Sequence, residues 1–257
     1  MSRPLRIGQI VPSSNTTMET EIPAMLRARE NIRPERFTCH SSRMRMQKVT
    51  KEELESMNRE GVRCAAELAD ARVDVMSTAC LVAIMAMGLG YHRKMEEELT
   101  AAARANHLLA PVMTSAGALI EGLKTLGARR ISLMAPYMRP LTDLVVKYIE
   151  HEGIEVADSI CFDIPDNLEV GLRDPLQLVE DVRRLNTDGV DVVVASACVQ
   201  MPSLPAVQRI EDKLGIPTVS TAICTTRSML DRLGLEPVVP GAGALLSLHK
   251  PAVKQYA

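Results

Sequence analysis

The chain has 257 residues, of which 46% are hydrophobic and 24% charged, and its formal net charge is −2. This composition is typical of a globular protein with one large domain or two small ones, and it lacks the basic surplus that a nucleic-acid partner requires. Aromatic residues amount to 2% and tryptophan is absent, so the usual stacking platforms for bases are also scarce.

The sequence also argues against export and against membrane insertion. The N-terminal stretch "MSRPLRIGQIVP" has no long apolar segment of the kind found in signal peptides. The longest uncharged window, residues 75–91, is too short and too polar to span a bilayer. We therefore expect a cytoplasmic protein that partners neither a membrane nor nucleic acid.

Apolar runs alternate with helical patterns along the chain. Runs typical of buried strands occupy residues 5–11, 72–79, 108–116, 130–135, 190–197 and 216–222. Between them, residues 51–71 and 91–105 have apolar side chains near the 3.6-residue period of a helix. Buried strands separated by helices predict parallel sheets covered on both faces, which is an α/β fold. Ligands of such folds bind beyond the carboxyl ends of the strands.

The two halves of the chain resemble each other. "RIGQIV" from Arg6 aligns with "RISLMA" from Arg130, "VDVMSTAC" from Val73 with "VDVVVASAC" from Val190, and "PVMTSAGALI" from Pro111 with "PTVSTAICTT" from Pro217. Three matches in the same order indicate a duplicated unit. We therefore predict two similar Rossmann-like (flavodoxin-like) lobes with parallel sheets, related by a pseudo-twofold axis, with the active site in the cleft between them.

The duplication also suggests where the lobes divide. We place the N-terminal lobe at residues 1–117 plus 225–257 and the C-terminal lobe at residues 118–224, with the last segment of the chain returning to pack on the first lobe.

Six cysteines are spread along the chain, and no two form a C-x-x-C motif. We therefore expect free thiols and no metal site. Most free cysteines act as small buried hydrophobic residues, and we expect this of Cys39, Cys64, Cys161 and Cys224. Chemistry is expected only where the position of a cysteine indicates it.

Two cysteines have such a position. Cys80 and Cys198 end equivalent strands of the two lobes, so their thiols should face one cleft from opposite sides. The first strand of each lobe delivers polar residues to the same cleft, at 12–15 and at 136–137. Helices are predicted to begin just after each cysteine, at Leu81 and at Met201. Their N–H groups favour an anion, so we expect thiols of lowered pKa that are sensitive to oxidation.

The loops at these strand ends carry few charges. No lysine, arginine or histidine occurs in "PSSNTT" or "ACLVA". A bound carboxylate would thus be held by N–H groups, hydroxyls and amides, with Arg43 and Arg139 as more distant candidates. His92 is expected on the surface at a helix start, and without a Cys–His pair a papain-like hydrolysis is disfavoured.

Paired cysteines on duplicated lobes resemble the aspartate/glutamate racemase superfamily over essentially the whole chain. Its amino-acid racemases typically have Cys-Asn-Thr after the first cysteine and Gly-Cys-Thr-Glu around the second, whereas this chain has Cys80-Leu81-Val82 and Ala197-Cys198-Val199-Gln200. The segments "GQIVPSSNTTMETE", "ACLVAIMAMG", "APYMRPLT", "IPDNLEV", "SACVQMPSLPA" and "EPVVPGAGALL" are more similar to the maleate isomerase family.

This resemblance implies a homodimeric enzyme that needs no cofactor and converts a small dicarboxylate, maleate, to fumarate. Cys80 would add to the double bond as the nucleophile and Cys198 would be the proton donor, before rotation and elimination. The positions that match substrate-binding residues of the family are Asn15, Leu81, Val82, Tyr137, Asn167, Val199 and Gln200.

Other functions stay open at this stage. A racemase or epimerase of a small carboxylic acid would use the two thiols as acid and base on one carbon, with no covalent bond. A decarboxylase of the superfamily usually keeps one of the two cysteines, so the presence of both argues against it. A non-catalytic dicarboxylate-binding protein would bind the diacid unchanged.

Overall fold

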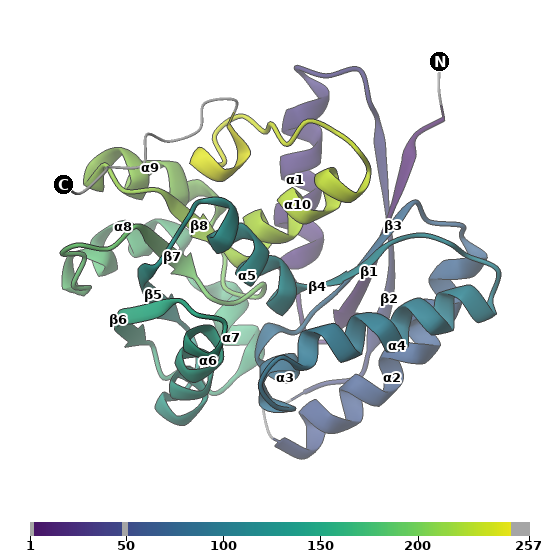
Figure 1. Cartoon of the computed structure of the whole chain (residues 1–257), viewed down its shortest axis with the longest axis horizontal. Coiled ribbons are helices and arrows are strands. Elements are labelled where there is room, and N and C mark those ends of the chain that lie inside the picture. The colour runs from purple at the N-terminus through teal and green to yellow at the C-terminus, as the bar shows by residue number, and fades with distance from the viewer. Residues whose placement is uncertain (1–2, 48–50, 248–257) are drawn as a thin grey trace.

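The computed structural model describes residues 3–47 and 51–247 (Figure 1). Its strands are β1 (Leu5–Pro12), β2 (Phe37–Met44), β3 (Val75–Thr78), β4 (Val112–Thr114), β5 (Arg130–Ala135), β6 (Glu155–Cys161), β7 (Val192–Ser196) and β8 (Thr218–Ser220). They form two all-parallel sheets, ordered β2-β1-β3-β4 and β6-β5-β7-β8. The second sheet repeats the topology of the first, so the predicted α/β fold with two similar lobes is confirmed.

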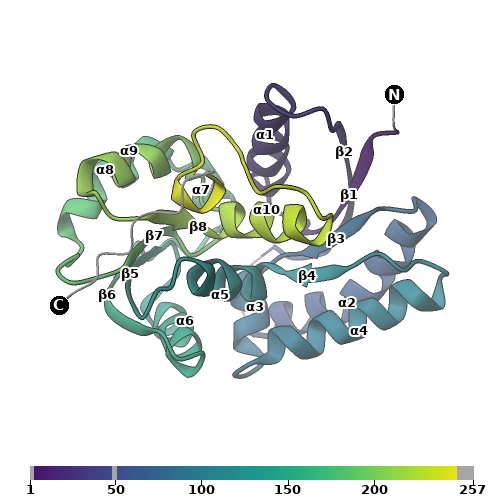
Figure 2. The same cartoon turned by 45° about the horizontal axis from the view of Figure 1, so that its top comes forward.

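Helices cover both faces of each sheet (Figure 2). They are α1 (Met18–Glu30), α2 (Lys51–Asp70), α3 (Leu81–Ala86), α4 (Tyr91–Ala105), α5 (Ser115–Thr125), α6 (Arg139–His151), α7 (Asn167–Leu172), α8 (Leu178–Asp181), α9 (Leu204–Leu214) and α10 (Thr221–Arg232). Helix α2 lies on one face of the first sheet, with α1 and α10 on the other, while α6 and α9 lie on opposite faces of the second. The central strands β3 and β7 are therefore buried along their whole length.

Two of the four edge strands, β2 and β6, are absent from the strands that the sequence predicts. Strand β2 has the sequence "FTCHSSRM" and β6 the sequence "EVADSIC", and most residues of both are exposed or half-buried. Neither has the continuous apolar run that identifies a strand buried on both faces, whereas the other two edge strands, β4 and β8, are buried and lie within predicted apolar runs. The six predicted strands are all present, most of them shorter than their apolar runs.

Helices α5 and α10 follow the equivalent strands β4 and β8 and pack against each other between the sheets (Figures 1 and 2). Helix α10 also contacts α1, β3 and β4 of the first sheet. The division of the lobes at 117/118 and 224/225 falls inside these two helices, and residues 248–257 lie outside the described part of the chain. We keep that division as a proposal.

His92 contributes to the contact between the lobes, which corrects its predicted place on the surface. It lies in the first turn of α4 and is only 6% exposed. Its backbone N–H donates to the hydroxyl oxygen of Tyr148 on α6 at 3.1 Å, and its Nδ1 is hydrogen-bonded to the same hydroxyl. The neighbouring Arg93 forms an ion pair with Glu152. The surface expectation fails because the helix start faces the second lobe.

Candidate active site

Cys80 lies between the end of β3 and the start of α3. It is the N-cap residue of α3 and is 8% exposed. The backbone N–H groups of Ala83 and Val82, at the start of α3, act to lower the pKa of Cys80, but burial has the larger effect. Burial, together with the nearby Cys198, raises the pKa of Cys80 to about 12.

Cys198 lies beyond the end of β7 and is 4% exposed. The backbone N–H of Gln200 donates to its sulfur at 3.3 Å. Burial raises the pKa of Cys198, although hydrogen bonds from Tyr137, Gln200 and Met201 to the sulfur act in the opposite direction. The helix predicted to start at Met201 begins three residues later, at Leu204, so loop N–H groups rather than a helix N-terminus contact this thiol.

The expectation of two thiols with lowered pKa values is therefore corrected. Both sulfur atoms are shielded from water, and burial of an ionisable thiol favours its neutral form more than a few N–H groups favour the thiolate. A negative charge on Cys198 also raises the pKa of Cys80. Over the physiological pH range the pair thus carries at most one negative charge.

Tyr137, which follows β5, lies beside Cys198. Its hydroxyl lies 3.1 Å from the carbonyl oxygen of Ala197 and also within hydrogen-bond reach of the sulfur of Cys198. Its single proton can serve one of these acceptors at a time. Burial and the charges that Cys198 and Cys80 can carry raise the pKa of Tyr137 well above its ordinary value. Tyr137 is therefore a neutral hydrogen-bond donor beside the Cys198 sulfur.

Two predicted asparagines lie on either side of the interface between the lobes, both almost fully buried. The Oδ1 of Asn15 accepts from the backbone N–H groups of Thr17 and Met18 at 3.0 and 2.9 Å, which fixes the amide and leaves Nδ2 to donate elsewhere. Asn167, at the start of α7, donates through Nδ2 to the hydroxyl of Ser14 at 2.8 Å.

The side chain of Gln200 is occupied by contacts within the protein. Its Oε1 accepts from the N–H of Thr16 at 2.9 Å, and its Nε2 donates to the carbonyl oxygens of Asn167 at 2.7 Å and Ser14 at 3.2 Å. It thereby joins the loop after β1 to the second lobe. Leu81, Val82 and Val199 are also fully buried around the two cysteines. These neighbours offer a ligand backbone N–H groups and apolar surface.

The more distant arginines are engaged with other groups. Arg43 donates to the carbonyl oxygen of Ser13 at 2.8 Å and pairs with Glu19. Arg139 pairs with Asp143 at 3.7 Å and lies 3.3 Å from the hydroxyl of Ser159. The donors nearest the thiols are therefore uncharged.

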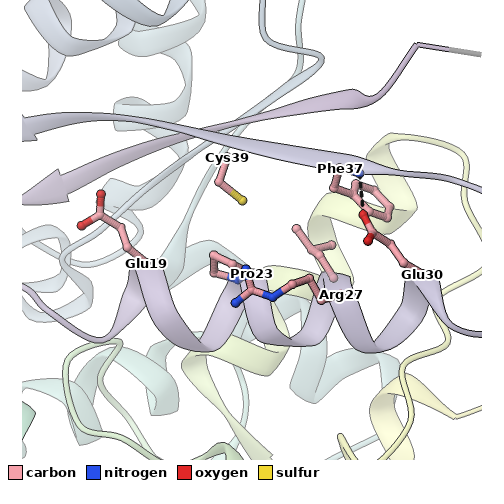
Figure 3. Close-up of a pocket in the computed structure, with 7 residues that line it drawn as sticks. Glu19, Pro23, Arg27, Glu30, Phe37 and Cys39 are labelled. Atoms are coloured by element: carbon pink, nitrogen blue, oxygen red, sulfur yellow. Dashed lines mark hydrogen bonds between the residues drawn. The ribbon is translucent and has the colours of Figure 1, made fainter.

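A surface groove of about 270 Å³ lies elsewhere, between α1 and β2 (Figure 3). Cys39 points into it from β2, and the carboxylate of Glu30 accepts the backbone N–H of Phe37 at 2.8 Å. Cys39 is exposed and Cys161 half-buried, so of the four cysteines expected to be structural only Cys64 and Cys224 are core residues. The groove contains neither Cys80 nor Cys198.

Among the described residues, 3–47 and 51–247, no helix has the length and apolar character needed to cross a membrane. In the same part of the chain, no group of three or more histidine, cysteine, aspartate or glutamate side chains is placed to hold a metal ion.

Comparison with known proteins agrees with this geometry. The sequence model of the arylmalonate decarboxylase family matches residues 7–246. This match shows that the chain belongs to that family, within the aspartate/glutamate racemase-like superfamily. A curated maleate isomerase from Pseudomonas putida is 63% identical over 247 residues, which cover 96% of this chain and 99% of that protein. The chain belongs to the maleate isomerase family.

Two solved structures bear on the site. The crystal structure of a maleate isomerase from Pseudomonas putida superposes with a TM-score of 0.95, at 56% identity, covering 96% of this chain and 99% of that one. A Nocardia farcinica maleate cis-trans isomerase, solved as a cysteine-to-serine mutant with a covalently bound succinylcysteine intermediate, has a TM-score of 0.92 at 44% identity, covering 96% and 100%. In that relative, a cysteine bonds covalently to the diacid.

Proposed function

We propose that this chain catalyses the cis–trans isomerisation of maleate to fumarate without a cofactor. The observation that carries the proposal is the pair of buried thiols, one from each lobe, with the Tyr137 hydroxyl within hydrogen-bond reach of the Cys198 sulfur. The succinylcysteine in the Nocardia farcinica relative supports a covalent route.

The proposed mechanism begins with addition. The Cys80 thiolate forms a C–S bond to one alkene carbon, and the π electrons move onto the other carbon and its carboxylate, giving an enediolate. The Cys198 thiol then gives its proton to that carbon, which leaves a succinyl group on Cys80 and a thiolate on Cys198. The former double bond is now single and can rotate.

Elimination reverses these steps. The Cys198 thiolate removes a proton from the same carbon, the double bond re-forms in the trans geometry, and the Cys80 thiolate departs. Asn15, Tyr137 and Asn167 would donate hydrogen bonds to the carboxylates, where charge develops in the transition state. The Val199 and Gln200 backbone and the N-terminal residues of α3, Leu81 and Val82, would complete the binding surface.

The charge of the thiol pair suits this scheme. Addition needs one thiolate, and protonation needs one thiol at the same time. Because a negative charge on Cys198 raises the pKa of Cys80, a pair with a single charge is the state available for turnover. The Val82 and Ala83 N–H groups that face the Cys80 sulfur would stabilise that charge at the nucleophile.

The test is to incubate the purified, reduced protein with maleate, without cofactor, and follow fumarate by proton NMR. We expect fumarate from the wild type and from Cys39→Ala, a matched control at an exposed cysteine, and none from Cys80→Ala. The Cys198→Ser variant, whose hydroxyl can still supply the proton, should accumulate the mass of one added maleic acid on Cys80. Unchanged maleate with folded wild-type protein would contradict the proposal. Exchange of α-carbon protons in deuterated water would then test the racemase alternative.

We further propose that the enzyme works in the cytoplasm as a homodimer. A reducing compartment would keep two neighbouring thiols from forming a disulfide, and the family resemblance implies the dimer. Light scattering of the purified protein would measure its mass in solution, and a monomer would contradict the dimer.

A further inference from the structure

The two thiols are held in different ways, although their strands are equivalent. Helix α3 begins at the residue directly after Cys80, so the helix itself fixes that cysteine. Cys198 is separated from α9 by residues 199–203. We call residues 197–203 the Cys198 loop. A loop of this kind needs anchors at both ends to hold its cysteine in one position.

The near part of the Cys198 loop is anchored within its own lobe. The hydroxyl of Ser196 lies 2.8 Å from the carbonyl oxygen of Cys198 and 3.2 Å from that of Met201. These contacts fix the turn around the thiol but leave the end of the loop, where it enters α9, to another partner.

That partner comes from the other lobe. Ser203 is the N-cap residue of α9, yet its own side chain does not cap the helix. Instead Oε1 of Glu21, on α1, accepts the backbone N–H groups of Ser203 and Leu204, both at 2.6 Å, and Oε2 lies 3.3 Å from the Ser203 hydroxyl. Glu21 is 7% exposed and Ser203 fully buried. Without this carboxylate, two buried N–H groups would lose their acceptor.

We propose that Glu21 is a positioning residue that caps α9 from the opposite lobe and so fixes the Cys198 thiol relative to Cys80. The inference rests on the proposed function for the role of Cys198. Helix α1 begins three residues after Asn15, whose side chain accepts N–H groups at its start. One segment of the first lobe thus sets the position of both a carboxylate-binding amide and the proton-donating thiol.

The test measures each thiol separately. Wild type and Glu21→Ala are treated with iodoacetamide at alkaline pH, and alkylation of each cysteine is followed by peptide mass spectrometry. We expect Cys198 to react about tenfold faster in Glu21→Ala, and kcat for maleate to fall by about 10- to 100-fold, since small displacements of a reacting group cost that much. Cys80 and the buried Cys224 should keep their wild-type alkylation rates.

Two further variants complete the design. Glu21→Gln should restore both kcat and Cys198 protection, because its amide oxygen can accept the same two N–H groups. Glu19→Ala, on the same helix but paired with Arg43 at the surface, is the control and should behave as wild type. If Glu21→Ala does not fold, Glu21→Asp takes its place, because its shorter side chain cannot reach Ser203.

Unchanged Cys198 alkylation and kcat in the Ala or Asp variant would overturn the inference. So would equal acceleration at Cys80, Cys198 and Cys224, which would indicate a general loss of stability. The alkylation result does not depend on maleate turnover. An inactive wild type would therefore contradict the proposed function while the thiol measurement still decides the role of Glu21.

Discussion

At the scale of single residues, the pKa of Cys80 is determined by two opposing influences. Two backbone N–H groups favour the thiolate, as expected at the start of a helix. Burial and the second thiol favour the neutral form and are stronger, so the pKa is raised to about 12. A nucleophile of this kind is protected from oxidation and alkylation while at rest, and is ionised only in a small fraction of molecules at neutral pH.

This raised pKa predicts how activity changes with pH. Below the pKa of Cys80, each added pH unit increases the thiolate fraction by about tenfold. We expect kcat/KM for maleate to rise between about pH 7 and pH 9, where the substrate carboxylates are already ionised. Initial rates at low substrate concentration across this range measure the effect. A plateau over the whole range would show that the thiolate forms at a lower pH than burial dictates.

The sequence allows some of these residues to be predicted and hides others. Cys80, Cys198, Asn15 and Tyr137 follow strands, and a parallel fold brings strand ends together, so their meeting can be predicted. Asn167 could be found only through family resemblance, because "PDN" is otherwise an ordinary turn sequence. The contact between Glu21 and Ser203 spans 182 residues. Nothing in either local sequence indicates it.

At the scale of elements, the short helix α7 packs closely against the residues that join the two lobes. A Cβ at Gly171 would lie 2.6 Å from Nε2 of Gln200 and 2.7 Å from the hydroxyl of Thr16. Both atoms belong to the hydrogen-bonded group that joins the lobes. Glycine at this position is therefore required for the close approach of α7.

Gly171→Ala should destabilise the protein by about 1–3 kcal/mol, the usual cost of overpacking a filled interior. It should also lower kcat/KM, since Asn167 lies on the same helix. Urea denaturation and the maleate assay measure the two effects. Glu169→Ala is a matched control on an exposed position of α7, where we expect a change within about 0.5 kcal/mol. Equal stabilities of the two variants would contradict the close packing.

The strands show why some elements are easier than others to predict from the sequence. Central strands are covered on both faces and carry continuous apolar sequence, so β1, β3, β5 and β7 are recognisable. The edge strands β2 and β6 are held by backbone hydrogen bonds to one neighbour and leave many side chains in solvent. Their side-chain pattern therefore resembles that of a loop, and only pairing with β1 and β5 makes them strands.

At the scale of the whole molecule, the lobes meet along a second buried contact, between His92 and Tyr148. Burial lowers the pKa of His92 below its ordinary value, because the imidazolium ion would lose its hydration. In the unfolded chain the same imidazole binds a proton near pH 6.5. Below that pH the unfolded state therefore binds more protons than the folded state, and the free energy of unfolding falls as the pH is lowered.

Wild type should accordingly lose more stability between about pH 7 and pH 5 than His92→Gln, which has no titratable group at this position. Urea denaturation at several pH values gives the two slopes. His151→Gln, at an exposed histidine, is the control and should keep the wild-type slope. Identical slopes for wild type and His92→Gln would show that His92 does not contribute to acid sensitivity.

The two-lobed architecture was the easiest feature to predict, because the internal repeat can be recognised in the amino-acid sequence. Three ordered matches predicted two similar lobes, and the sheets have the same strand order. The packing of α5 against α10 could not be read in this way, since repetition defines each unit but does not say how the units join.

The burial of both sulfur atoms has a consequence for turnover. With 8% of Cys80 and 4% of Cys198 exposed, little of either residue is open to solvent in this arrangement of the lobes. We therefore expect the protein to open and close again around its substrate in each catalytic cycle. The rate of this opening then limits how fast any substrate or inhibitor can enter the site, however reactive it is toward sulfur.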